Sequence, residues 1–108
     1  MLFICVYIYI CIVDDMVDTA GTLCKAAEIL KEQGARRVFA FCSHGVLSGA
    51  AASRIKNSVL TELVVLDTIV LSDECQATGK ITQLSVGPLL AQAIYNIHSR
   101  KSISALFK

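Results

Sequence analysis

Apolar runs alternate with amphipathic stretches along the chain. Residues 1–13, MLFICVYIYICIV, are apolar throughout, and a run without alternation is typical of a strand buried on both faces. Ile, Val, Tyr, Phe and Cys also favour strands. Because the run is long for one strand, only its later part, about residues 7–13, is expected in the sheet, with the earlier residues frayed or out of place.

Further along, helical and strand patterns follow each other in turn. Residues 22–33 put Leu23, Ala26, Ala27 and Leu30 on one helical face, and Gly34 ends that helix. Strands are predicted at residues 37–42, 62–68 and 81–86, and a short helix at 50–58, whose Arg54 and Lys56 are expected to face water. A last helix is predicted after Ser85, which is expected to be its N-cap, and its apolar stripe is Leu89, Leu90, Ala93, Ile94 and Ile97.

This alternation of strands and helices predicts an α/β domain with right-handed crossovers and a mainly parallel sheet flanked by helices. Ligands of such sheets bind beyond the carboxyl ends of the strands. Three segments with polar residues fall at that edge, 14–22, 43–49 and 67–79. With 108 residues and no linker or repeat, the chain is expected to be one domain, residues 1–108.

Composition narrows the classes of function. The hydrophobic fraction is 55% and the net charge is +1, so bulk charge gives no reason to expect a nucleic-acid or membrane partner. The 5 cysteines have no zinc-ligand spacing and are an odd number, which favours thiols in a reducing cytoplasm and no metal–thiolate site. The apolar start lacks the basic flank and cleavage site of a signal peptide and is too short to span a bilayer.

The stretch VDDMVDTAGT, residues 13–22, joins two kinds of chemistry. Asp18, Thr19, Ala20, Gly21 and Thr22 lead into a helix N-terminus, where free N–H groups and hydroxyls favour a phosphate and Gly21 is expected to adopt unusual torsions. Asp14 and Asp15 sit earlier, at the predicted strand end, where carboxylates can accept hydrogen bonds from sugar hydroxyls. The stretch therefore predicts a sugar-phosphate site. In the alternative interpretation, Asp18 or Thr19 only caps the helix and the acids form a solvated turn.

Several motifs in order resemble one family. VDDMVDTAGTL resembles the phosphoribosyl-diphosphate motif of type I phosphoribosyltransferases, and with GARRVFAFCSHGVLSG, VVLDTI and SISALF it is closer still to ribose-phosphate diphosphokinases. The resemblance runs from about Ile12 to Phe107. It implies a type I phosphoribosyltransferase-like fold, with Asp14 and Asp15 on the ribose of ribose 5-phosphate and residues 18–22 on its phosphate. The family moves the diphosphate of Mg-ATP to the sugar, giving AMP and phosphoribosyl diphosphate.

The resemblance covers only the C-terminal half of a two-domain synthetase, and residues 1–11 are atypical of it. The half that would bind ATP has no counterpart here, so we expect no catalytic residue, no metal ligand, and Mg²⁺ only together with ATP. We expect the chain to be inactive alone and to form homo-oligomers or associate with full-length synthetase. Two alternatives are a phosphoribosyltransferase that uses phosphoribosyl diphosphate, and a non-catalytic subunit.

Other polar residues are weaker candidates. His44, Asp67 and Thr68 follow strands at the ligand edge and are candidates to line the site. The resemblance makes Ser102 and Ser104 candidates for binding a regulatory phosphate. A single histidine in such a turn is more often structural.

Overall fold

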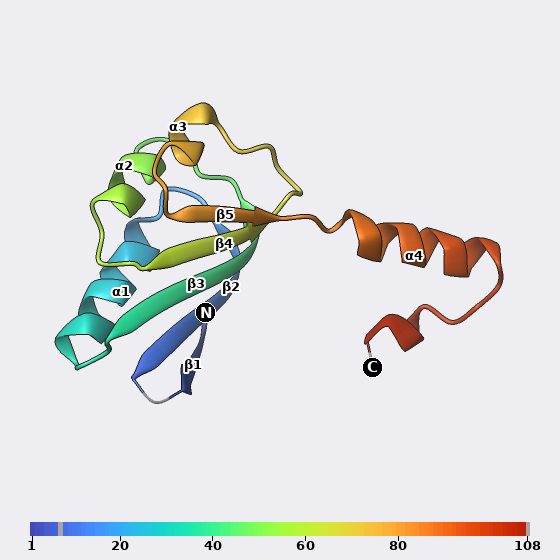
Figure 1. Cartoon of the computed structure of the whole chain (residues 1–108), viewed down its shortest axis with the longest axis horizontal. Coiled ribbons are helices and arrows are strands. Elements are labelled where there is room, and N and C mark those ends of the chain that lie inside the picture. The colour runs from blue at the N-terminus through green and yellow to red at the C-terminus, as the bar shows by residue number, and fades with distance from the viewer. Residues whose placement is uncertain (7, 108) are drawn as a thin grey trace.

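The structure is a computed structural model that describes residues 1–6 and 8–107. Its described residues form one five-stranded sheet with helices (Figure 1). The strands are β1 (Leu2–Val6), β2 (Tyr9–Val17), β3 (Arg37–Gly45), β4 (Glu62–Leu66) and β5 (Ile81–Leu84). The helices are α1 (Gly21–Glu32), α2 (Ala51–Lys56), α3 (Asp73–Gln76) and α4 (Gly87–His98), followed by the 3-10 helix η1 (Ser104–Phe107).

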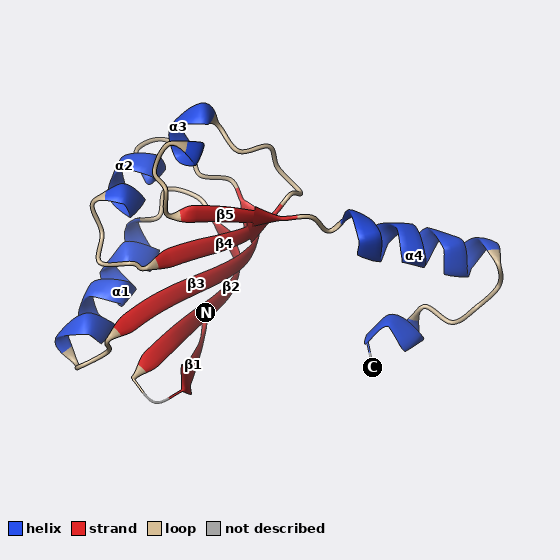
Figure 2. Cartoon of the chain, in the orientation of Figure 1, coloured by secondary structure: helices blue, strands red, loops and turns tan. Residues whose placement is uncertain are grey.

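The strands lie side by side in the order of the chain (Figure 2). β1 pairs with β2 antiparallel, and β2 to β5 pair in parallel. Right-handed crossovers that always step to the next strand in one direction place their helices on the same face. α1, α2 and α3 therefore cover one face of the sheet. The predicted α/β class with a mainly parallel sheet is confirmed.

The N-terminal apolar run differs from its prediction. Residues 2–6 are not frayed but form β1, which pairs along its length with β2, from Leu2 opposite Val13 to Val6 opposite Tyr9. The run is thus two strands of a hairpin, which explains why it is long for one strand. Tyr7, at the start of the predicted strand, lies outside the described residues. β2 also continues past the predicted end at Val13 as far as Val17.

Two predicted loops are partly regular. Residues 43–45 belong to β3, because β2 extends beside them and pairs Met16 with His44 and Val17 with Gly45. The predicted loop 69–80 contains α3, where the Ser72 hydroxyl accepts a hydrogen bond from the Cys75 N–H. The longer strands matter for function, because they carry the acids of residues 14–15 within the sheet.

The core lies between the sheet and its three helices. Ile12, Val38, Leu63 and Val65 of the strands are almost fully buried, as are Ala27 and Ile55 of the helices. Burying an aliphatic side chain of this size stabilises a fold by ~1.5–3 kcal/mol. This one-sided core fixes the strand ends from which the loops of the site emerge.

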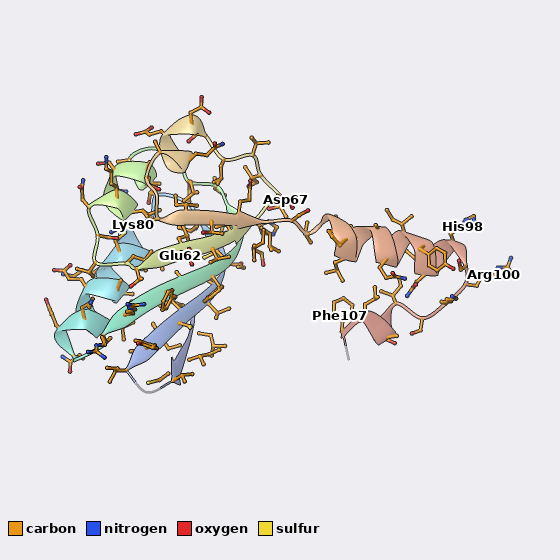
Figure 3. All side chains as sticks on the ribbon, in the orientation of Figure 1. Glu62, Asp67, Lys80, His98, Arg100 and Phe107 are labelled. Atoms are coloured by element: carbon orange, nitrogen blue, oxygen red, sulfur yellow. The ribbon has the colours of Figure 1, made fainter. Side chains whose placement is uncertain are left out.

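The opposite face of the sheet has no helix on it. Phe41 and Leu84 are 40% and 52% exposed, and Phe41 lies between the buried Ala40 and Cys42 in its strand. The last predicted helix is confirmed as α4, but it extends away from the sheet, with its apolar side chains in the open (Figure 3). Leu90, Ile94 and Ile97 of the predicted stripe are exposed. The Cα radius of gyration, 15.9 Å, exceeds the ~13 Å of a compact domain of this length.

One carboxylate links α4 to the sheet. Asp67, at the junction seen in Figure 3, accepts a 2.8 Å hydrogen bond from the N–H of Val86, the residue before α4. The Val86 N–H, together with the Ser85 hydroxyl, holds the pKa of Asp67 below its usual range. Ser85 accepts from the Gly87 N–H, but the prediction that it caps α4 is wrong, because the N-cap residue is Val86 and no side chain caps the helix. No helix in the described part of the chain is long and apolar enough to cross a membrane.

Candidate functional site

The loop between β2 and α1 borders a cavity of about 300 Å³. Residues 18–23 line it together with Met1, Asp14, Met16, Val17 and Cys42. Of the seven residues predicted to bind ribose 5-phosphate, the structure brings Asp14, Asp18, Thr19, Ala20, Gly21 and Thr22 to this cavity. Asp15 is adjacent in the chain but does not line it. Their roles in binding stay predictions.

The N-terminus of α1 presents N–H groups that no side chain caps. No side chain caps α1, and its first turn contains no acidic residue. The first N–H groups of a helix have no partner within the helix and favour negative charge. The alternative interpretation that Asp18 or Thr19 caps the helix is wrong, because the N-cap residue is Ala20 and the Asp18 carboxylate instead accepts from the Ser48 hydroxyl.

The unusual torsion of the loop lies one residue earlier than predicted. Ala20 has a φ of 65°, in the left-handed region, whereas Gly21 has no positive φ. A Cβ at Gly21 would meet only the Arg54 Nη1, at 3.9 Å. The expectation that Gly21 supplies the torsional freedom of the loop is therefore wrong. Ala20 takes the strained conformation in an almost fully buried position, which requires its neighbours to hold it there.

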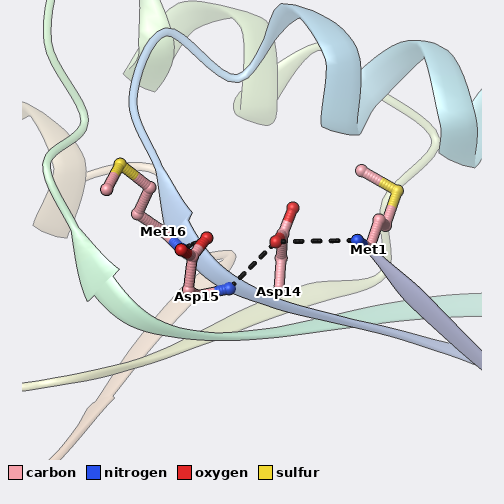
Figure 4. A network of polar contacts seen from close by, with 4 residues as sticks. All are labelled: Met1, Asp14, Asp15 and Met16. Carbon is pink, nitrogen blue, oxygen red and sulfur yellow. Dashed lines mark hydrogen bonds and ion pairs between the residues drawn. The ribbon is translucent and has the colours of Figure 1, made fainter.

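The paired acids lie in the C-terminal half of β2, before its last residue Val17, and are held by short local hydrogen bonds (Figure 4). Asp14 Oδ1 accepts from the Asp15 N–H at 2.9 Å, and Asp15 Oδ1 accepts from the Met16 N–H at 2.7 Å. Asp14 Oδ1 also lies 3.8 Å from the Met1 ammonium. A partly exposed ion pair of this kind is worth at most ~1 kcal/mol, so it does not prevent Asp14 from accepting hydrogen bonds from a ligand.

Cys42 is a cavity residue that the sequence interpretation missed. It lies opposite Asp14 in the parallel register of β2 and β3, and that register was the signal that could have found it. Burial, followed by the negative charges of Asp14 and Asp15, raises the pKa of the Cys42 thiol to about 11. The thiol is therefore neutral at neutral pH, and it presents a weakly polar wall rather than a nucleophile.

Alkylation of Cys42 by iodoacetamide should consequently be slow at neutral pH, and its rate should rise about tenfold per pH unit until it levels off near pH 11, since only the thiolate reacts. Mass spectrometry of the Cys42 peptide measures this rate. In a variant with Asp14→Asn and Asp15→Asn the pKa should fall and the reaction at pH 9 should accelerate, while access to the thiol is unchanged. Equal rates in the two proteins would contradict the assignment of the two carboxylates as a cause.

His44, Asp67 and Thr68 lie together at the ligand edge, but none of them lines the cavity of the loop. His44 Nδ1 is 2.8 Å from the Thr68 hydroxyl oxygen, and the same oxygen is 3.3 Å from the Ser43 carbonyl. Asp67 is occupied by the Val86 N–H. These contacts connect the ends of β3 and β4, and a role of the three residues in a ligand site stays a prediction.

Ser102 lies between α4 and η1, and Ser104 is the first residue of η1, so both are far along the chain from this cavity. Their hydroxyls are 2.7 Å apart, and the Ser102 carbonyl accepts from the side chain of Asn96 in α4. The expectation that they bind a regulatory phosphate is untested. Among residues 1–6 and 8–107, no group of three His, Cys, Asp or Glu side chains could hold a metal ion.

Comparison with known proteins identifies the family. The model of the phosphoribosyl synthetase-associated domain matches residues 6–108. Ribose-phosphate pyrophosphokinases of Vibrio cholerae and Bordetella pertussis are 62% and 59% identical over 96 residues, which is 89% of this chain and 31% of each relative. A solved structure, the phosphoribosylpyrophosphate synthetase from Mycobacterium smegmatis, matches with a TM-score of 0.79 and 34% identity over 83% of this chain and 30% of its own.

The chain thus spans about a third of the length of the curated relatives that it matches. The resemblance inferred from VDDMVDTAGTL and the later motifs is confirmed by all three comparisons. The alternating strands and helices, the loop at the N-terminus of α1 and these similarities together lead to one conclusion: the chain belongs to the phosphoribosyl synthetase-associated domain family and is a ribose-phosphate pyrophosphokinase family domain.

Proposed function

We propose that this domain binds ribose 5-phosphate, with the phosphate on the loop of residues 18–22 and the ribose hydroxyls on Asp14 and Asp15. The observation that carries the proposal is that one cavity has two chemically different walls. Uncapped N–H groups of α1 lie on one side and the Asp14 carboxylate on the other. A ligand that carries both an anion and hydroxyl groups matches this pair, and the relatives are ribose-phosphate pyrophosphokinases.

In the proposed reaction, the bound sugar presents its 1-hydroxyl to the β-phosphorus of ATP. The hydroxyl loses its proton to water as its oxygen forms a bond to that phosphorus. The bond between the β-phosphorus and the oxygen that bridges it to the α-phosphate breaks, AMP leaves with that oxygen, and the β- and γ-phosphates remain on the sugar as diphosphate. What these residues contribute is orientation: the loop holds one end of the sugar and the carboxylates hold the other. Transfer of phosphoryl groups depends mainly on positioning and on neutralising charge.

We expect this chain to bind Mg²⁺ only together with a substrate that carries phosphate groups. Asp14 and Asp18 line the same cavity, and Mg²⁺ is usually held by one or two carboxylates together with substrate phosphates rather than by a protein cage. We therefore propose that Mg²⁺ arrives with ATP, where it would offset phosphate charge, and that Asp14 and Asp18 are the residues of this chain nearest to it.

We further propose that ATP is bound by the part of the relatives that this chain does not span. The domain would then act in a homo-oligomer or beside full-length synthetase, and its exposed apolar surfaces on α4 and on the bare sheet face support association. Cysteine usage leads us to propose a cytoplasmic location. No feature of the cavity suggests a nucleic-acid or membrane partner.

Isothermal titration calorimetry of the 108-residue chain with ribose 5-phosphate tests the binding proposal. We expect saturable binding that is weaker for ribose and for inorganic phosphate alone, since each occupies one wall of the cavity. Binding of a purine or pyrimidine base with phosphoribosyl diphosphate would instead support a phosphoribosyltransferase. Failure to bind any sugar phosphate would overturn the proposal.

An assay of AMP release tests the proposal that ATP is bound by the part of the relatives that this chain does not span. With ATP, Mg²⁺ and ribose 5-phosphate, the 108-residue chain alone should release no AMP above background, because the triphosphate and the sugar must be held together for transfer. Turnover near the ordinary enzyme range of about 1 per second or faster would contradict the proposal that ATP binding lies outside this chain.

A further inference from the structure

The segment after β3 holds the last residue of β2, Val17, and the first two residues of the loop before α1. Residues 46–54 belong to the turn that leads into α2 and to α2 itself. The Val46 and Leu47 N–H groups both donate to the Val17 carbonyl, at 3.0 Å and 3.2 Å. The Ser48 hydroxyl donates to the Asp18 carboxylate. Arg54 Nη1 donates to the Thr19 carbonyl at 2.9 Å. Arg54 and Thr19 are 35 residues apart in the sequence. The expectation that Arg54 faces water is incomplete, because its guanidinium also donates this hydrogen bond to the loop.

Arg54 contacts the loop on the side opposite the cavity. It lines a groove between α1 and α2 with Gly21 and Cys24, and it does not line the cavity that faces the loop from the other side. Its Nη1 lies 3.9 Å from the position of a Cβ at Gly21. The guanidinium is thus close to the loop backbone but is not among the residues that would meet a ligand in the cavity.

The position of the Thr19 carbonyl determines where the next N–H points. In a trans peptide the C=O and the N–H point in opposite directions, and the chain has no cis peptide bond among its described residues. Because Arg54 holds the Thr19 carbonyl on the groove side, the Ala20 N–H is directed away from the groove, towards the cavity that Ala20 lines. Ala20 has a φ of 65°, a conformation that needs such external support in a residue other than glycine.

We propose that Arg54 is a positioning residue of the anion-binding loop: through the Thr19 carbonyl it fixes the Thr19–Ala20 peptide so that the Ala20 N–H is available to a phosphate. This inference rests on the proposed function for the identity of the anion. The orientation of the peptide itself does not depend on it, and the two parts can be tested separately.

The test compares three variants of the 108-residue chain. Arg54→Met removes the guanidinium and keeps an apolar stem, whereas Arg54→Lys keeps a cationic donor of similar reach. Lys56→Met is the matched control, because Lys56 is an exposed cation in the same helix without a contact to the loop. All three are surface substitutions and should unfold at nearly the same temperature as the parent chain.

Two measurements are made on each variant: the Kd for ribose 5-phosphate by calorimetry, and the hydrogen-exchange rates of backbone amides by NMR without ligand. Arg54→Met should weaken binding about tenfold, as expected for loss of one charged hydrogen bond, and should accelerate exchange at residues 20–22 selectively. Arg54→Lys should recover most of the affinity, and Lys56→Met should match the parent chain in both measurements.

The outcomes separate the two proposals. If Arg54→Met and Lys56→Met weaken binding equally and leave the loop amides unchanged, Arg54 contributes only its charge and the inference is overturned. If Arg54→Met accelerates exchange at residues 20–22 but the parent chain binds no ribose 5-phosphate, the positioning role holds and the proposed ligand is wrong.

Discussion

Replacing both Asp14 and Asp15 by Asn should weaken the binding of ribose 5-phosphate by about a hundredfold or more. A hydrogen bond to a charged group contributes roughly 1.5–3 kcal/mol, and two such bonds correspond to at least about two factors of ten in affinity. Asn keeps an Oδ1 that can still accept from the Asp15 and Met16 N–H groups, so the end of β2 should remain folded. Calorimetry at constant ionic strength measures the effect.

Asp73 and Glu74 offer a matched control, because they are also adjacent, exposed acids. The variant with Asp73→Asn and Glu74→Gln removes the same two charges from α3, and these residues do not line the cavity. Its affinity should stay within about twofold of the parent chain, as expected for screened, distant charges. If the two double variants bind alike, the acids at the end of β2 do not hold the sugar.

The second large effect is expected at Ala20. Ala20→Val should abolish measurable binding of ribose 5-phosphate and destabilise the fold by about 2 kcal/mol, because a β-branched side chain strongly resists a positive φ. The position is also almost fully buried, which leaves little room for two further methyl groups. Chemical denaturation measures the stability, and calorimetry measures the binding of the fraction that folds.

Ala20→Gly is the companion variant. Glycine adopts a φ of 65° without the cost of ~1–2 kcal/mol that other residues have in the left-handed region, and this gain offsets the ~0.8 kcal/mol lost with one buried methyl group. Stability and affinity should therefore remain close to those of the parent chain. Tight binding by Ala20→Val would show that the left-handed conformation at this position is not required for the site.

The sequence predicted those features that depend on local pattern. The strands near residues 37, 62 and 81, the helix after Thr22 and the convergence of polar loops at one edge all follow from periodicity and chain order. The β1–β2 hairpin was missed because residues 1–13 contain no Gly, Pro, Asn or Asp to indicate a turn. The direction of α4 was not predictable either, since an apolar stripe shows that a helix has a face to bury but not where.

The features that the sequence did not predict depend on contacts between residues that are distant in the chain. Nothing in the sequence around Arg54 indicates the Thr19 carbonyl, and nothing around Asp67 indicates the Val86 N–H. The left-handed torsion was assigned to Gly21 because glycine is its usual host, whereas the structure places it at Ala20. That the left-handed torsion falls on the alanine and not on the glycine can be predicted only when the neighbours that hold the loop are known.

The sequential order of the strands also has a consequence for how the chain acquires its structure during synthesis. Each strand after β1 pairs with the strand made just before it, so the sheet can grow in the order of synthesis. Domains can fold as the chain emerges from the ribosome. The cavity residues all precede residue 43 and their supporting segment ends at Arg54. The binding loop and its support are thus synthesised before β4 and β5, and α4 is added to a sheet whose ligand edge is already assembled.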